Sequence, residues 1–101
     1  MKISIETMKK VGIYCIQNTI NNKRYIGSSI NIYHRLHQHR SYLRRNAHLN
    51  GHLQNSYNKN GEKIFITSIL ECCEQLNLAI REQYYIDLFN AEYNIDRKSV
   101  V

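Results

Sequence analysis

The 101-residue sequence contains no proline and no tryptophan, and only four glycines. No apolar run reaches the length of a membrane span, and the N-terminus lacks the apolar segment of a signal peptide. The three cysteines include an adjacent pair, Cys72 and Cys73, and form neither a disulfide framework nor a Cys-x-x-Cys metal site. We therefore expect free, buried thiols in a soluble intracellular protein that has no membrane partner.

Acidic residues are absent from a long part of the chain. No Asp or Glu lies between Glu6 and Glu62, whereas this window holds nine of the 14 Lys and Arg residues and all five histidines. A net charge of +6 distributed in this way is typical of a polyanion-binding surface and argues against a protein-interaction domain. A solvated basic face is the alternative. The predicted nucleic-acid-binding residues are Lys23, Arg24, Arg40, Arg44 and Arg45.

The length and the 43% hydrophobic content predict one small globular domain. We place it at residues 11–96, after a polar lead-in at 1–10 and before a tail at 97–101. Isoleucine and asparagine have AT-rich codons and abound here, while proline is missing. This bias indicates a phage, organellar or low-GC bacterial source.

Two short β-rich segments each place a tyrosine beside a glycine. They are Gly12-Ile13-Tyr14 and Tyr25-Ile26-Gly27, and the segment between them is rich in asparagine, which tolerates turn conformations. Glycine in a strand lets another backbone or a ligand approach closely. These residues alone predict a hairpin with aromatic cross-strand packing.

A helix is predicted over 31–45, because no glycine interrupts it and apolar residues recur on one face. At 100° per residue, His39 falls inside the apolar stripe and Arg35 lies at its edge. Both side chains should therefore face the hairpin. The apolar stripe consists of Ile32, Leu36 and Leu43.

A second helix is predicted over about 49–58, and a strand over 63–71. Asn60-Gly61 supplies the stop between them, since either residue can adopt the left-handed cap conformation. The near-continuous hydrophobicity of the strand indicates burial on both faces. The apolar positions of the helix are Leu49, Leu53 and Tyr57.

The last predicted helix spans about 74–89 and is followed by a turn over 90–94. Glu82 lies in the middle of its apolar face, where a carboxylate is costly unless it is paired or bound to a metal. The sequence leaves two alternatives open, a structural ion pair with an arginine and a metal ligand at an active site. The apolar face consists of Leu78, Ala79, Tyr85, Ile86 and Phe89.

The two tyrosine–glycine segments, continued by Ser28 and Arg35, resemble the signature of the GIY-YIG nuclease family. The resemblance extends to Glu82 and to Tyr93-Asn94-Ile95, so it covers nearly the whole chain from Val11 onward. It implies an α+β fold, with a small three-stranded antiparallel sheet flanked by helices. It also implies a metal-dependent DNA endonuclease, specifically the catalytic module of a homing endonuclease, with double-stranded DNA as its partner.

The resemblance assigns roles to individual residues. Glu82 would be the only direct protein ligand of a Mg²⁺ or Mn²⁺ ion, and Arg35 would clamp the scissile phosphate. Tyr14 would be the general base, and Tyr25 would position the nucleophile or the phosphate. The predicted catalytic residues are Tyr14, Tyr25, Arg35, His39, Glu82, Asn94 and His48.

The remaining roles concern the histidines and Asn94. His39 would accept the phenol's proton, and as an imidazole it is expected to titrate near neutrality. Asn94 would hold the site together, and His48 corresponds to a histidine of phage-type homing members. A zinc site at His48 and His52 lacks a third ligand of evident spacing.

We expect the other histidines, His34, His37 and His52, to lie on the surface. The chain is expected to act as a monomer or as a module of a longer chain with separate DNA-binding elements. The alternative function is a non-catalytic nucleic-acid-binding module with the same fold.

Overall fold

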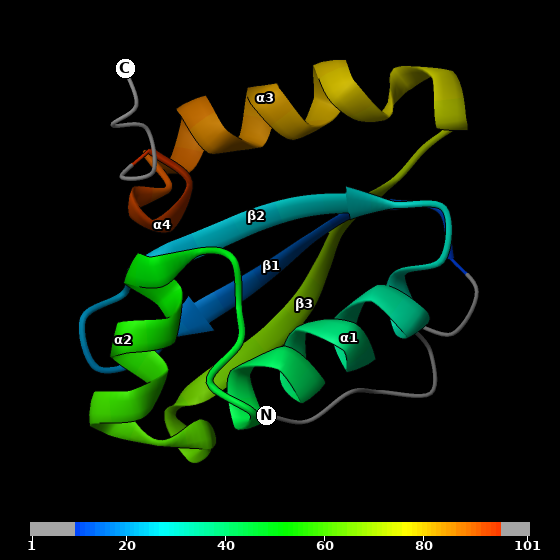
Figure 1. The fold of residues 1–101 in the computed structure, drawn as a ribbon. Helices are drawn as coiled ribbons and strands as arrows, with labels where there is room; N and C mark the ends of the chain where they lie inside the picture. Colours follow the sequence, from blue (N-terminus) through cyan, green and yellow to red (C-terminus); the bar gives the residue numbers. More distant parts are fainter. Residues whose placement is uncertain (1–9, 96–101) are drawn as a thin grey trace.

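The computed structural model describes residues 10–95, and only the backbone of Ile95. The predicted lead-in, apart from Lys10, and the predicted tail lie outside the described residues. Three antiparallel strands form one sheet in the order β2-β1-β3, with β1 at Gly12–Asn18, β2 at Arg24–Ser29 and β3 at Phe65–Cys72. Helices α1 and α2 cover one face of this sheet and α3 covers the other (Figure 1). The predicted α+β class is confirmed.

The central strand β1 serves both faces of the sheet. Alternate side chains of a strand point to opposite faces, so Tyr14 and Ile16 join the core beneath α1 and α2. Ile13 and Cys15 join a second core beneath α3. The hairpin turn that follows β1 places Asn22 at a φ of 64°, a left-handed conformation that asparagine tolerates.

Helix α1 spans Ile32–Arg44, in agreement with the predicted helix. The Asn31 side chain caps it by accepting a hydrogen bond from the backbone N–H of His34. His39 is buried in the apolar stripe as predicted, with 1% of its surface exposed. The helix therefore carries an imidazole into the core beside the hairpin.

Helix α2 spans Gly51–Asn60, and the predicted start at Leu49 is wrong. Asn50 caps the helix through its side chain, so Leu49 lies in the preceding loop and is fully exposed. The N-cap decides the start here, because asparagine satisfies a backbone N–H that leucine cannot. The predicted stop is confirmed, since Gly61 has a φ of 87°.

The predicted burial of the third strand on both faces is wrong. Strand β3 pairs only with β1 and is an edge strand, and only Phe65 along it is buried, while Ile66 is half exposed. A one-residue register shift interrupts the β1–β3 pairing between Ile13 and Tyr14. The apolar residues of β3 therefore lie on one covered face and on one face that is partly exposed to solvent.

The second face carries α3 at Leu78–Phe89, entered through a 3₁₀ turn at Gln75–Asn77. The short helix α4 at Glu92–Ile95 lies beside β2, and its Tyr93 joins the core beneath α1 and α2. Another 3₁₀ turn, Glu62–Ile64, precedes β3. Most of the predicted apolar face of α3 packs on the second core, but Ala79 is exposed. The short helix occupies part of the predicted terminal turn.

The three cysteines differ in their exposure to solvent. Cys15 is buried, but Cys72 is exposed and Cys73 is half-buried, so burial of all three thiols was wrong. Cys72 and Cys73 lie at the end of β3, where the chain leaves the sheet. None of the helices within residues 10–95 has the length and apolar character that crossing a membrane requires.

Candidate active site

The two signature glycines create space for the site. Tyr14 and Gly27 are direct partners in the β1–β2 register, and a Cβ atom at Gly27 would lie 2.3 Å from the Tyr14 hydroxyl. A Cβ atom at Gly12 would lie 2.1 Å from the backbone oxygen of Glu71 on β3. Gly27 therefore lets the Tyr14 ring lie against β2, and Gly12 allows close strand pairing.

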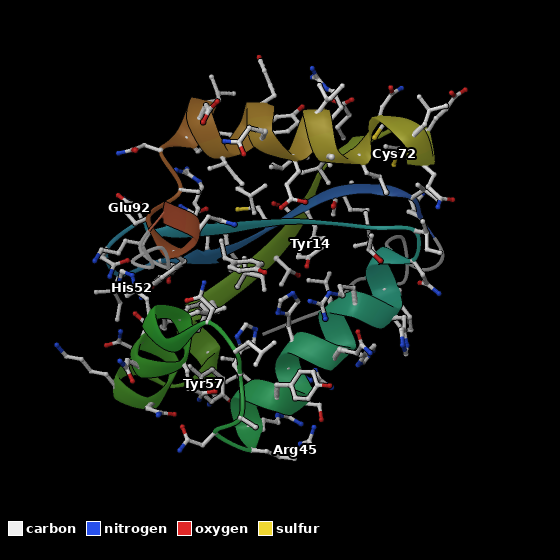
Figure 2. All side chains as sticks on the ribbon, turned by 45° about the horizontal axis from the view of Figure 1, so that its top comes forward. Tyr14, Arg45, His52, Tyr57, Cys72 and Glu92 are labelled. Carbon is white, nitrogen blue, oxygen red and sulfur yellow. The ribbon has the colours of Figure 1, made fainter. Side chains whose placement is uncertain are left out.

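Tyr14 heads a chain of hydrogen bonds that leads away from the sheet. Its Oη lies 2.6 Å from Nε2 of His39, and Nδ1 of His39 lies 2.7 Å from Nε2 of His48. The chain ends where the backbone N–H of Asn50 donates to Nδ1 of His48 over 3.0 Å. Figure 2 shows Tyr14 pointing from the sheet toward α1. The two predicted catalytic histidines are thus linked in series to Tyr14, His39 directly and His48 through His39.

Tyr14 and Tyr25 are placed differently with respect to solvent. Tyr14 has 1% of its surface exposed, whereas Tyr25 is half-buried and lines an open pocket. Both rings meet the His39 ring edge-on, at centroid distances of 5.5 and 5.1 Å. Tyr25 is therefore the phenol at the open side of the site, and Tyr14 is the phenol at its floor.

The buried position of this chain shifts its titration. Burial raises the pKa of Tyr14 well above its usual range, Tyr25 and Glu82 push it the same way, and the charge and a hydrogen bond of Arg35 oppose the rise. Burial also lowers the pKa of His39 to about 3, helped by the nearby charges of Arg35 and His48. The pKa of His48 is lowered as well, again mainly by burial. The expectation that His39 titrates near neutrality is therefore wrong.

Arg35 forms the cationic part of the site. Its side chain is half-buried and donates a hydrogen bond of 3.2 Å to Gln38 Oε1. No carboxylate among residues 10–95 pairs with it. It lines two adjoining pockets of about 270 and 220 Å³, which share His48 and Leu49 as walls. An unneutralised guanidinium at a solvent-open hollow suits a phosphate group.

Glu82 approaches the site from α3. The Ser28 hydroxyl donates to its Oε1 over 2.5 Å. No other hydrogen bond or ion pair to Glu82 is present among the described residues. The alternative of a structural ion pair at Glu82 is thus not supported. The half-buried carboxylate of Glu82 can still bind a cation.

Asn94 fastens the second signature segment. Its Oδ1 accepts the backbone N–H of Ile26 over 2.7 Å, and its Nδ2 donates to the Ile26 backbone oxygen over 2.8 Å. This pair of bonds occupies the outer edge of β2 in place of a further strand. It holds Tyr25 and Gly27 in register, which is a positioning role.

The basic residues that we predicted to bind nucleic acid do not form one surface. Arg44 is held by Glu62 in a two-point ion pair of 2.8 and 2.9 Å at the end of α1. Arg24 instead lies over the Phe89 ring on α3, 4.6 Å from its centroid, on the opposite side of the sheet. Arg45 lies over the Tyr42 ring at the end of α1. Arg40 also lies on α1, and Lys23 reaches His52 on α2.

The other histidines are less uniform than expected. His34 is exposed, His37 is half-buried with its ring against Tyr33, and His52 is half-buried against Tyr93. Within residues 10–95, no three His, Cys, Asp or Glu side chains come together as a metal-binding group. A site at His48 and His52 therefore has no third ligand there.

Two residues that support His48 were missed in the sequence. Gln54 accepts the His48 backbone N–H through Oε1 and donates to the Leu43 backbone oxygen, so it ties the loop to α1. Asn50 donates to the Tyr93 backbone oxygen through Nδ2. An asparagine before Gly51 is a recognisable cap signal, but nothing in the pattern singles out Gln54.

We predict that His39 makes stability depend on pH. Because its pKa is about 3 when folded and near 6.5 when unfolded, the unfolded chain binds the extra proton between these values. The free energy of unfolding should therefore fall by about 1.4 kcal/mol per pH unit on acidification, about 3 kcal/mol between pH 6.5 and 4.

Urea unfolding at several pH values measures this effect. The His39→Gln protein should show a flatter dependence than wild type, while His34→Gln, which changes an exposed histidine of the same helix, should not. Parallel curves for wild type and His39→Gln would contradict the prediction.

With this geometry established, known proteins can be compared. The family model described as the GIY-YIG catalytic domain matches residues 10–94. The chain belongs to the GIY-YIG catalytic domain family. Intron-associated endonuclease 1 of Enterobacteria phage T4 is 39% identical over 87 residues, which cover 84% of this chain. The match covers 35% of that relative, so this chain spans about a third of its length.

Solved structures agree with the family assignment. The catalytic domain of the homing endonuclease I-TevI has a TM-score of 0.78 and 38% identity, covering 84% of this chain and 94% of that domain. A mutant of the I-TevI catalytic domain gives a TM-score of 0.77 at 38% identity, with 84% and 89% covered. The predicted fold and family are confirmed.

Proposed function

We propose that this chain is the catalytic domain of a divalent-metal-dependent endonuclease that hydrolyses double-stranded DNA, as the catalytic module of a homing endonuclease. One observation carries the proposal. The unneutralised Arg35 lines an open pocket beside Tyr25, and both Arg35 and Glu82 lie close enough to Tyr14 to influence its ionisation. Phosphodiester hydrolysis needs a base, charge stabilisation and positioning, and two phenols, a guanidinium and a carboxylate can supply them.

The residues divide the work by position. Arg35 binds the scissile phosphate and neutralises the charge that develops on it. Tyr14 is the proposed base, and Tyr25 orients the nucleophile from the open side of the site. Asn94 holds the second signature segment in place through its two bonds to Ile26.

The carboxylate of Glu82 fits a Mg²⁺ or Mn²⁺ ion. A hard cation of this kind prefers oxygen ligands, keeps several waters and often binds through only one or two carboxylates. Glu82 is half-buried and has no cationic partner among residues 10–95, which agrees with this chemistry. When bound, the metal supplies charge stabilisation for the departing oxygen.

A plasmid-nicking assay with and without Mg²⁺ tests the proposal. The domain should convert supercoiled plasmid only when the metal is present, and excess EDTA should stop it. Binding of DNA without nicking at any metal concentration would favour the alternative, a non-catalytic nucleic-acid-binding module. We also propose that the chain acts as a monomer or as a module of a longer protein, which sedimentation velocity would test.

The neighbours Arg44 and Arg45 give a matched test of DNA contacts. Arg44 is paired with Glu62, whereas no carboxylate among the described residues pairs with Arg45. Each phosphate contact contributes about 0.9 to the log–log salt slope of binding. We predict that Arg45→Gln lowers the slope by roughly one unit and that Arg44→Gln lowers it much less.

Fluorescence anisotropy at several salt concentrations would measure both slopes. Equal decreases would mean that the ion pair opens on DNA, and an unchanged slope for Arg45→Gln would place the contacts elsewhere.

A further inference from the structure

The hydrogen-bond chain that ends at Asn50 has one member whose direction is fixed. A backbone N–H can only donate, and the Asn50 N–H points at Nδ1 of His48 over 3.0 Å. That nitrogen therefore carries no proton, so a neutral His48 has its proton on Nε2. His48 cannot be doubly protonated while this bond exists.

The tautomer of His48 in turn fixes the tautomer of His39. Nε2–H of His48 must donate to Nδ1 of His39 over 2.7 Å, which leaves Nδ1 of His39 without a proton. A neutral His39 then carries its proton on Nε2, which lies 2.6 Å from the Tyr14 oxygen. Every bond in the chain consequently points toward the phenol.

We propose that the Asn50 backbone amide and His48 fix the polarity of this chain, so that His39 donates a hydrogen bond to Tyr14 and does not accept its proton. His48 is on this view a positioning residue that acts through His39. The inference rests on the proposed function, because it concerns how the chain prepares Tyr14 for DNA hydrolysis.

The polarity favours an ionised phenol. The Tyr14 oxygen accepts a hydrogen bond from His39, and the guanidinium of Arg35 lies close enough to favour the ionised form of the phenol; both groups remain in place when the phenol loses its own proton. Hydrogen bonds to the charged form lower the free energy of that form. Among residues 10–95, the titratable or charged groups that face His39 are Tyr14, Tyr25, Arg35 and His48, and none of them is a carboxylate.

The loop that carries His48 is held firmly enough to impose this direction. Its backbone N–H is bound by Gln54, and the side chain of Asn50 bonds both the Tyr93 backbone oxygen and the Leu53 N–H. The Asn50 amide is thereby fixed relative to the imidazole. The tautomer is set by the backbone and not by a neighbouring charge.

The direct test is long-range ¹H–¹⁵N correlation NMR of the wild-type domain without DNA or metal. The expected spectrum shows His39 and His48 neutral and protonated on Nε2. A proton on Nδ1 of His39 would overturn the proposal. This measurement does not depend on cleavage, so it decides the polarity even if the proposed nuclease function fails.

A matched pair of variants tests the functional consequence. In His48→Gln, an amide N–H occupies the place of Nε2–H and preserves the polarity, whereas the carboxylate of His48→Glu can only accept and forces the proton of His39 onto Nδ1. We expect single-turnover cleavage to be at least about tenfold slower for His48→Glu than for His48→Gln. If His39 instead accepts the phenol's proton, the carboxylate should orient it for that task and the order should reverse.

Equal rates or a reversed order would overturn the proposal. Thermal unfolding of both variants identifies any loss of fold, in which case the wild-type NMR result decides.

Discussion

Glu82→Gln is expected to lower the rate of DNA cleavage by roughly 10³-fold or more while the domain stays folded. The amide keeps an oxygen for the Ser28 hydroxyl, so the hydrogen bond between β2 and α3 is preserved. Only the negative charge is lost, and with it the affinity for a hard divalent cation. A bound metal contributes several kcal/mol of charge stabilisation in hydrolysis, which corresponds to about three orders of magnitude in rate.

Two measurements separate a metal ligand from a structural carboxylate. Single-turnover cleavage at increasing Mg²⁺ gives the rate, and calorimetric titration with Mn²⁺ gives metal binding independently of activity. Asp87→Asn is the matched control, because it removes an exposed charge from the same helix. Ser28→Ala should weaken metal binding by about 10- to 100-fold and be rescued at high metal concentration, since it only orients the carboxylate.

A Glu82→Gln protein that binds Mn²⁺ normally would contradict the assignment. So would cleavage at the wild-type rate. Loss of cleavage with unchanged metal binding would instead give Glu82 a role at the substrate.

The parts of this fold that local pattern determines were predictable. The hairpin follows from β-rich residues on both sides of an asparagine-rich turn, and α1 follows from its apolar period and from the absence of an interrupting glycine. The burial of His39 followed from the same period, because its position inside the apolar stripe of α1 turns its side chain toward the core. The glycines of the signature also acted as expected, by admitting the Tyr14 ring and the backbone of β3.

The parts of the fold that depend on tertiary arrangement could not be predicted from the sequence. Nothing in the sequence of β3 shows that it would be an edge strand, since that depends on the order in which the strands pair. The contact between His39 and His48 depends on a loop held by Gln54, a residue with no local signal. The low pKa of His39 likewise follows from what surrounds it in space.

The other large effect is expected at Tyr14. Removing a general base typically costs 10²- to 10⁴-fold in rate, and Tyr14→Phe deletes only the oxygen that His39 and Arg35 contact. The change should also lower the free energy of unfolding by about 1–3 kcal/mol, because a buried ring nitrogen of His39 loses its partner.

The pH dependence of the rate carries the decisive information. Because burial raises the pKa of Tyr14 above its usual range, only a small fraction is ionised near neutrality, and that fraction grows tenfold with each pH unit. The single-turnover rate of wild type should therefore rise steadily between pH 6 and 9 without levelling, and it should show no inflection from His39, whose pKa is about 3. In Tyr14→Phe both the rate and its slope against pH should fall.

Tyr25→Phe is the control that the geometry provides, because Tyr25 lies at the open side of the site and Tyr14 at its floor. If Tyr14 is the base, Tyr25→Phe should cost less and keep the wild-type slope, since water in the open pocket can replace an orienting hydroxyl. If Tyr25→Phe is the slower protein and loses the slope, the base is the exposed phenol and Tyr14 supports it from below. If both variants keep the slope, neither tyrosine supplies the titrating group, and the tyrosine-base mechanism does not operate in this chain.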